Sequence, residues 1–279
     1  MLPLLLTILC SVAIAAILRF SEGRDGDRYV VAGANYVVAG ILSMMLMPPA
    51  ASAAGSGQIA FGVFVGLGFV GGFVSLMAAM NRIGMAVPAT TARISTLIPV
   101  LGSVILYRET PSALQIAGIV TGIAAFVVLG MAQRRQHRDD GVGSLALWLL
   151  AAVFVIAGTI DFALKIAHES GASRGPFLLI VFGTACAVCW IIVLIGRRRV
   201  NGRDLLVGAV LGIPNFGASY FLLQALGELE GVVVFPTANA AIVLGVTAVA
   251  ILGWRERPSP TTVAGLALAA AAVVLLGLG

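Results

Sequence analysis

The chain has 279 residues, of which 60% are hydrophobic and 10% are charged, whereas about 25% of the residues of an average soluble domain are charged. So few charges cannot cover the surface of a water-soluble core, which excludes an ordinary globular protein. The formal net charge of +5 does not indicate a nucleic-acid partner, because the basic residues lie in the short breaks between apolar runs.

Ten apolar runs follow one another along the chain, each close to the roughly 20 residues that cross a bilayer core of about 30 Å. They are residues 1–18, 29–48, 58–80, 85–106, 113–131, 144–164, 176–196, 205–226, 231–253 and 260–278. The first run lacks a basic n-region and is longer than a typical signal-peptide core, so we interpret it as the first helix. The expected fold is an all-α polytopic membrane protein with ten transmembrane helices.

The distribution of basic residues predicts the orientation of these helices. The breaks after the first, third, fifth, seventh and ninth runs carry 13 Lys and Arg residues, whereas the other breaks and both termini carry 3. By the positive-inside rule the first set is cytoplasmic, which places both termini outside. Frequent Arg, Ala and Gly are typical of a GC-rich bacterial coding sequence, so the expected location is the inner membrane.

Polar residues of the second to fourth helices are candidates for a substrate site. Asn35 lies on the second helix and Ser75 on the third, while Arg93 lies near the middle of the fourth, with Thr90 and Thr96 about 60° to either side of it. An ionisable side chain in hydrocarbon usually faces a partner or a water-filled cavity. Arg93 is therefore predicted to bind an anionic or zwitterionic group of the substrate.

Four prolines interrupt the apolar pattern. Pro88 and Pro236 lie near the starts of the fourth and ninth helices, Pro99 lies centrally in the fourth, and Pro214 lies within the eighth. Each removes a backbone donor and is expected to bend or break its helix. Two interpretations stay open: the half-helix ends meet the charge of a substrate, or the kinks serve only packing.

The breaks after the fourth and ninth helices carry Glu109 and Glu256, each beside an Arg. They are either gate candidates or solvated ion pairs, and exposed pairs contribute little to stability. In the helices that follow, Gly118, Gly122 and Gly265 form small-xxx-small patterns that allow close helix packing. The fifth and tenth helices are therefore expected to be scaffold or the surface of a homodimer.

The sixth helix carries Asp161 and Lys165, which share a face because they are four residues apart. They form either a boundary ion pair, with Lys165 reaching the membrane surface, or a pair in which Asp161 binds a coupling proton. Asp161 is also the alternative, permanent partner of Arg93. On the seventh helix, Cys186 and Cys189 have no neighbour that would activate a thiol, so they are interpreted as inert apolar residues.

The eighth and ninth helices add further polar candidates. Asn215 and Ser219 lie on one face of the eighth helix, and Asn239 lies on the ninth. Any one of them could simply bond two helices together. Taken with the polar residues of the first half, they form the few convergent polar groups that small-molecule recognition needs.

The two halves of the chain repeat each other. RETPSALQIAG, from Arg108, and RERPSPTTVAG, from Arg255, share six identical residues at a distance of 147 positions, and PATTARI also matches PTANAAI. A fainter match relates the third and eighth helices at a shift of 144. Because corresponding helices are five apart, the repeats 1–140 and 141–279 are expected to cross the membrane in opposite senses, as in many secondary transporters.

The segments GMAVPATTARISTLIPVLGSVILYRETPSALQIAG, AGTIDFALK, GIPNFGASYFLLQALGELEG and FPTANAAIVLGVTAVAILGWRERPS resemble those of an EamA-like permease of the drug/metabolite transporter superfamily. The resemblance implies a cavity lined by helices 1–4 and 6–9, with helices 5 and 10 at the periphery. It leaves the substrate open, since members handle amino acids, nucleotide sugars, drugs or lipid-linked groups. The membrane-embedded Glu that small multidrug members carry in the first helix has no counterpart here.

The expected function is that of a secondary transporter that moves a small polar or amphipathic metabolite by alternating access. A channel and a non-transporting membrane subunit are the alternatives. An intramembrane enzyme is disfavoured because His137 and His168 lie in polar breaks and neither a GxSxG nor an HExxH motif occurs. No cofactor, metal or nucleic acid is expected, and the expected partners are the substrate, the bilayer and a second copy of the chain.

Overall fold

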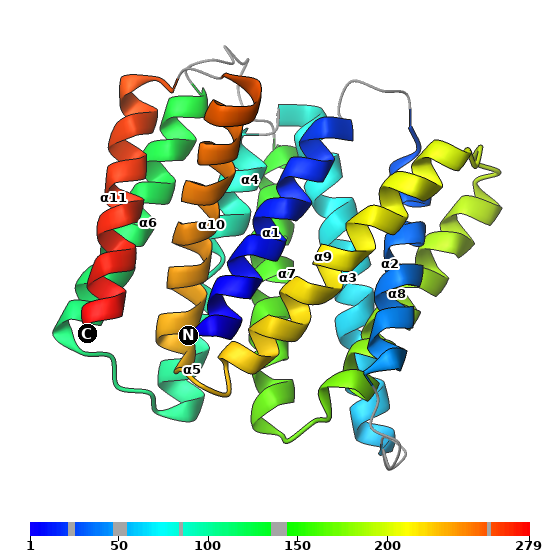
Figure 1. Ribbon diagram of the computed structural model, residues 1–279, viewed down its shortest axis with the longest axis horizontal. Helices are drawn as coiled ribbons and strands as arrows, with labels where there is room; N and C mark the ends of the chain where they lie inside the picture. The colour runs from blue at the N-terminus through cyan, green and yellow to red at the C-terminus, as the bar shows by residue number, and fades with distance from the viewer. Residues whose placement is uncertain (22–25, 47–54, 84–85, 135–143, 256–257) are drawn as a thin grey trace. The chain divides into compact units, whose positions relative to one another are not determined.

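A computed structural model (Figure 1) describes residues 1–21, 26–46, 55–83, 86–134, 144–255 and 258–279. Within these ranges all regular secondary structure is α-helical. The helices are α1 (Leu2–Ser21), α2 (Arg28–Met45), α3 (Ser56–Ile83), α4 (Ala86–Ile94), α5 (Leu97–Tyr107), α6 (Ala113–Arg134), α7 (Ser144–Glu169), α8 (Arg174–Ile195), α9 (Gly202–Ala225), α10 (Gly231–Trp254) and α11 (Pro260–Leu278).

Length and composition identify a polytopic membrane protein. Among the described residues, nine helices are long and apolar enough to cross a membrane, and a shorter apolar segment covers Thr91–Tyr107. Large apolar side chains on α6 and α11 point away from the chain: Val120 is 60% exposed and Val274 is 57% exposed. Such side chains suit contact with lipid, and soluble proteins rarely expose large continuous apolar patches.

The predicted fourth helix, residues 85–106, is broken in two. It stops as α4 and resumes as α5 after a turn at Ser95 and Thr96. Pro99 explains the break, because it has no N–H to donate to the carbonyl of Ser95. That carbonyl accepts from the backbone N–H of Ile98 instead, at 2.9 Å.

The other three prolines do not interrupt their helices. Pro88 lies in the first turn of α4, where a missing N–H leaves no intrahelical bond unmade. Both α9 and α10 continue through Pro214 and Pro236. The helix is therefore broken at Pro99 and not at Pro88, Pro214 or Pro236, where the alternative of a bend stays a prediction.

The described helices form two compact units. Unit 1 comprises Met1, Gly71–Lys165 and Leu226–Gly279, and unit 2 comprises Leu2–Val70 and Ile166–Ala225. Each unit combines segments from both predicted repeats, so the compact units do not coincide with the boundary expected near residue 140.

In unit 2, α2 packs against both α8 and α9, and α1 packs against α9. Glycines bring the backbones together: a Cβ added at Gly212 of α9 would lie 2.6 Å from the carbonyl oxygen of Asn35 on α2. A Cβ added at Gly66 of α3 would likewise lie 2.6 Å from the carbonyl oxygen of Val181 on α8. Small residues permit this close approach of helices in a membrane.

In unit 1 the most extensive helix pair is α6 with α11, which run antiparallel (Figure 1). Gly118 of α6 lies against Leu276 of α11, and Gly265 of α11 lies against Leu129 of α6. Gly122 packs in the same interface. The small-residue faces are thus buried within one chain, and the homodimer through these helices, which stays a prediction, would have to use their outer faces.

The described residues at the two ends of the repeated RE-x-PS segments have the same local structure. Arg108 and Arg255 each follow a helix in the left-handed conformation, with φ 54° and ψ 32°, and each donates its N–H to the carbonyl five residues earlier. The hydroxyls of Ser112 and Ser259 then accept the N–H three residues later, at 3.2 Å in both cases. Such caps stabilise a helix start by about 1 kcal/mol.

Helix contacts repeat as well. Each of the following contacts joins the two halves of the chain, and a shift of 146 positions (Gly66 to Gly212), which exchanges the halves, maps one such contact onto another. The matched contacts are Gly66–Val181 with Gly212–Asn35, Gly62–Ile180 with Gly208–Ala34, and Gly71–Ile156 with Gly217–Cys10. The shift of 144 expected for the third and eighth predicted helices is therefore corrected to 146. Tyr36 and Phe182, which the same shift relates, stack on each other with ring centroids 6.2 Å apart.

Candidate functional site

Arg93 and Asn239 form the centre of the candidate site in unit 1. Arg93 lies one residue before the end of α4, and its guanidinium donates to the side-chain oxygen of Asn239 on α10 at 2.9 Å. The Asn239 amide donates in turn to the backbone carbonyl of Phe235, at 3.1 Å. Asn239 is 9% exposed, so these bonds hold the guanidinium in a fixed place beside the break between α4 and α5.

Asp161 of α7 lies within electrostatic reach of Arg93. The backbone of α7 approaches the break closely, because a Cβ added at Gly158 would lie 2.6 Å from the carbonyl oxygen of Ser95. The hydrogen bond of the Arg93 guanidinium, however, goes to Asn239 rather than to Asp161. Asp161 therefore acts on Arg93 through space, and the guanidinium has a neutral partner in direct contact.

Three hydroxyls in the described part of unit 1 are buried with no hydrogen-bond partner, those of Thr96, Ser103 and Thr237, and two of them belong to the segments that carry Arg93 and Asn239. Thr96, in the turn between α4 and α5, is 2% exposed, and Thr237, two residues before Asn239, is 8% exposed. Thr96 was predicted as a site residue, whereas Thr237 was not singled out, although it lies in the repeated PTANAAI segment. Thr90 is on α4, but its side chain lies outside the described residues. Ser75, on α3, is half-buried.

The remaining predicted site residues belong to unit 2. Asn35 of α2 is 5% exposed and its side-chain oxygen is buried without a partner. On α9, Ser219 is buried and Asn215 is half-buried. The eight polar residues predicted as one site are thus divided between the units, and within unit 1 the structure brings Arg93 and Asn239 together.

Lys165 differs from its prediction. Its side chain is 1% exposed and pairs with the 9% exposed carboxylate of Glu109, so it neither reaches the membrane surface nor forms the expected boundary pair with Asp161. Glu109 also accepts the backbone N–H groups of Gly231 at 3.1 Å and Val232 at 2.9 Å. The alternative of a solvated Glu109 paired with its neighbouring Arg is therefore wrong, while Glu256 lies outside the described residues.

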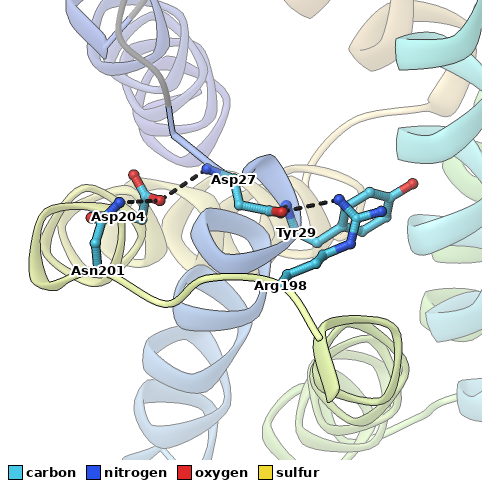
Figure 2. Close-up of polar contacts among 5 residues, drawn as sticks. All are labelled: Asp27, Tyr29, Arg198, Asn201 and Asp204. Carbon is cyan, nitrogen blue, oxygen red and sulfur yellow. Dashed lines mark hydrogen bonds and ion pairs between the residues drawn. The ribbon is translucent and has the colours of Figure 1, made fainter. Parts of the chain in front are cut away.

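A second polar cluster, which sequence reasoning missed, joins the starts of α2 and α9 in unit 2 (Figure 2). Asp27 accepts from the N–H of Tyr29 at 2.9 Å and from the guanidinium of Arg198 at 3.0 Å. Arg198 also lies over the Tyr29 ring, 4.3 Å from its centroid. This cluster fixes the loop after α8 to the start of α2.

Asp204 is the buried member of this cluster. The residue is 5% exposed. Its carboxylate accepts from the N–H of Asp27 and from the amide of Asn201, both at 2.9 Å. Asn201 accepts from the N–H of Asp204 at 2.8 Å, so the two residues cap α9 reciprocally. The sequence signal was present: Asn followed three residues later by Asp is a helix-start pattern.

The described part of the chain has no cluster of metal-ligating side chains, and it has three free thiols. No group of three or more His, Cys, Asp or Glu residues is placed there to hold a metal. Cys10, Cys186 and Cys189 are free thiols, and Cys186 and Cys189 lie on α8 as expected.

The chain is similar to known proteins over its whole length. No model of a known protein family matches it. An uncharacterized protein of Haemophilus influenzae is 25% identical over 283 residues, which cover 98% of this chain and 96% of that protein. A crystal structure described only as that of a protein has a TM-score of 0.80 at 17% identity, covering 99% of this chain and 98% of the other. These similarities establish that the fold occurs in a solved structure, and they assign no activity.

Proposed function

We propose that the chain is a secondary transporter of the EamA-like kind, which moves a small polar or amphipathic metabolite across the bacterial inner membrane by alternating access. The observation that carries the proposal is the repetition of helix contacts when the two halves are exchanged. Gly66 with Val181 and Gly212 with Asn35 are one such pair of contacts.

The contacts of unit 1 support an inverted relation between the halves. Gly118 meets Leu276 and Gly265 meets Leu129, and in each case the shift of 147 positions that relates Gly118 to Gly265 also relates the leucines. Because α6 and α11 run antiparallel (Figure 1), a rotation that exchanges them has its axis across the helices. Such an axis lies in the plane of the membrane, as in inverted-repeat transporters.

Inverted halves give a carrier a physical basis for its cycle. Each half can adopt the conformation of the other, so the molecule has two states of similar free energy that open to opposite sides. A channel needs no such pair of states, because one open conformation is sufficient for flux.

Arg93 and Asp161 are the proposed recognition groups. A charge near the middle of a membrane-spanning segment is costly and usually functional, and Arg93 keeps a neutral direct partner in Asn239. Its guanidinium can therefore pair with an anionic group of the substrate, while Asp161 stays available for a cationic group or a coupling proton.

Counterflow in proteoliposomes tests the proposal, with a panel of amino acids, nucleosides and cationic dyes. We expect saturable uptake that is accelerated by unlabelled substrate inside the vesicles, and its loss in Arg93→Ala with folded protein retained. Arg82→Ala, at the exposed end of α3, is the matched control and keeps wild-type uptake. Flux that does not saturate and shows no counterflow would identify a channel instead.

A further inference from the structure

A carboxylate occupies the start of α10 in unit 1. Glu109 accepts the N–H groups of Gly231 and Val232, the first two residues of this helix, at 3.1 and 2.9 Å. The same carboxylate accepts from the ammonium of Lys165. Free N–H groups and the helix dipole make a helix start attractive to anions, and here a buried cation adds to that attraction.

The groups that surround this carboxylate come from three helices. Lys165 of α7 is 1% exposed and lies 5.0 Å from the centroid of the Tyr107 ring of α5. Ser103 of α5 is fully buried, and its hydroxyl has no partner. It lies so close to Gly231 that a Cβ there would collide with it, and that Cβ would also lie 2.9 Å from Cδ of Lys165. The N–H groups at the start of α10, Lys165 and Ser103 are therefore all donors, which suit a ligand with several acceptor atoms.

Glu109 itself belongs to a connection rather than to a helix. It follows Arg108, the left-handed residue after α5, and its own N–H makes a long bond of 3.3 Å to the carbonyl of Ser103. The ligand is thus carried on the segment between α5 and α6, whereas its receptor groups are carried on α5, α7 and α10.

We propose that the start of α10, Lys165 and Ser103 form a carboxylate-binding site, which Glu109 fills as a tethered ligand and which a free carboxylate can fill in its place. When Glu109 leaves, this end of unit 1 loses the contact that ties α5, α7 and α10 together, so the occupied site acts as a latch. The latch role rests on the proposed transport function, whereas the binding site does not.

Removal of the tethered ligand tests the site. Glu109→Ala removes about the atoms of acetate, so the thermal unfolding midpoint of the purified variant in detergent is expected to fall and then to rise saturably with added acetate. Binding to the folded state alone produces such a rise. Wild-type protein and Glu228→Ala, which removes an exposed carboxylate elsewhere in unit 1, are expected to show no response, and neither is Glu109→Ala combined with Lys165→Met.

Folded Glu109→Ala that does not respond to acetate, or that responds equally without Lys165, would overturn the site. The exchanged pair Glu109→Lys with Lys165→Glu gives an independent measurement, because an ammonium cannot accept the N–H groups of Gly231 and Val232. Rapid hydrogen exchange at those two amides is expected in the exchanged pair. Wild-type protection there would mean that the ion pair alone holds this end.

Counterflow by Glu109→Ala separates the latch from the site. An altered transport rate that acetate returns toward the wild-type value supports the latch. Acetate-dependent stability with an unchanged transport rate rejects the latch and retains the carboxylate site. A wild-type protein without counterflow of any substrate would reject the proposed transport function, and the stability measurement would still decide on the site.

Discussion

The guanidinium of Arg93 has a neutral amide as its direct partner and a carboxylate only at a distance. A direct ion pair would neutralise the charge and leave little attraction for a substrate. An amide instead fixes the direction of the guanidinium through one bond of 2.9 Å and leaves its other donors available. This arrangement suits a residue that binds and releases an anionic group.

Asn239→Asp is expected to weaken the binding of an anionic substrate group by Arg93. It places a carboxylate in contact with Arg93, so the two buried charges neutralise each other. An anionic substrate then has to compete with the carboxylate of the introduced Asp. The apparent affinity for substrate should fall by about tenfold or more, which corresponds to about 1.4 kcal/mol. Asn239→Ala, which leaves the charge without a partner, is the control in the same uptake assay. Equal affinities in the two variants would contradict the role assigned to the free charge.

Asp204 supports a prediction about stability. Asp204→Ala removes the acceptor of the N–H of Asp27 and of the amide of Asn201, two part-buried hydrogen bonds, and a typical intramolecular hydrogen bond contributes about 0.5–1.5 kcal/mol. Asp204→Asn should cost less, because its amide oxygen still accepts. Denaturant titration in detergent measures both, with the exposed neighbour Arg203→Ala as the control. Indistinguishable midpoints for the Asp204 and Arg203 variants would show that the cluster of Figure 2 contributes nothing to stability.

Sequence reasoning at this scale identified candidate site residues more readily than their partners. Arg93 and Asn239 were both singled out, because polar residues in apolar helices are conspicuous. Their contact was not predicted, and Lys165 was assigned to Asp161, four residues away, when it binds Glu109 on another segment. Spacing within one helix shows which residues share a face, but it cannot show what another helix brings to that face.

At the scale of elements, the length of the apolar runs located the membrane-spanning segments, and the break in one of them depends on a single proline. The segment of α4 and α5 contains Pro99 in its interior, whereas residues 243–254 of the corresponding α10 contain no proline, so α10 is continuous. Pro214 and Pro236 show that a proline alone is insufficient. At Pro99 the freed carbonyl of Ser95 accepts from the N–H of Ile98, three residues later, and the sequence does not show whether such a local bond forms.

The glycines at helix crossings allow a paired prediction. Gly66→Ala and Gly212→Ala each place a Cβ 2.6 Å from a backbone carbonyl oxygen, so the helices must separate, and overpacking of this kind costs about 1–3 kcal/mol. Because the two contacts are related by exchange of the halves, similar losses of thermal stability are expected. Gly40→Ala, where nothing lies within 4 Å of the added atom, is the control and should be neutral or slightly stabilising. A loss of stability at Gly40 as large as that at Gly66 would remove close packing as the cause.

For the whole molecule, composition and charge distribution predicted a polytopic helical protein, since few other folds tolerate so few charges. The two compact units were not predicted. They depend on contacts between helices far apart in the chain, such as α2 with α9 and α6 with α11, whereas a sequence repeat reports only which segments correspond. The predicted repeats and the compact units therefore divide the same helices into different groups.

The proposed inverted relation of the halves leads to a prediction about sidedness. Ala113 and Pro260 are repeat partners at the starts of α6 and α11, and both are exposed. If the halves cross the membrane in opposite senses, these positions lie on opposite sides, and the distribution of basic residues puts Ala113 outside and Pro260 inside. Cysteines introduced singly at each position, in a chain whose Cys10, Cys186 and Cys189 are replaced, report the side through an impermeant maleimide. Labelling of Ala113→Cys in intact cells, and of Pro260→Cys only after lysis, is expected. Labelling of both from the same side would mean that the halves run in the same sense, and the alternating-access proposal would then lose the symmetry on which it rests.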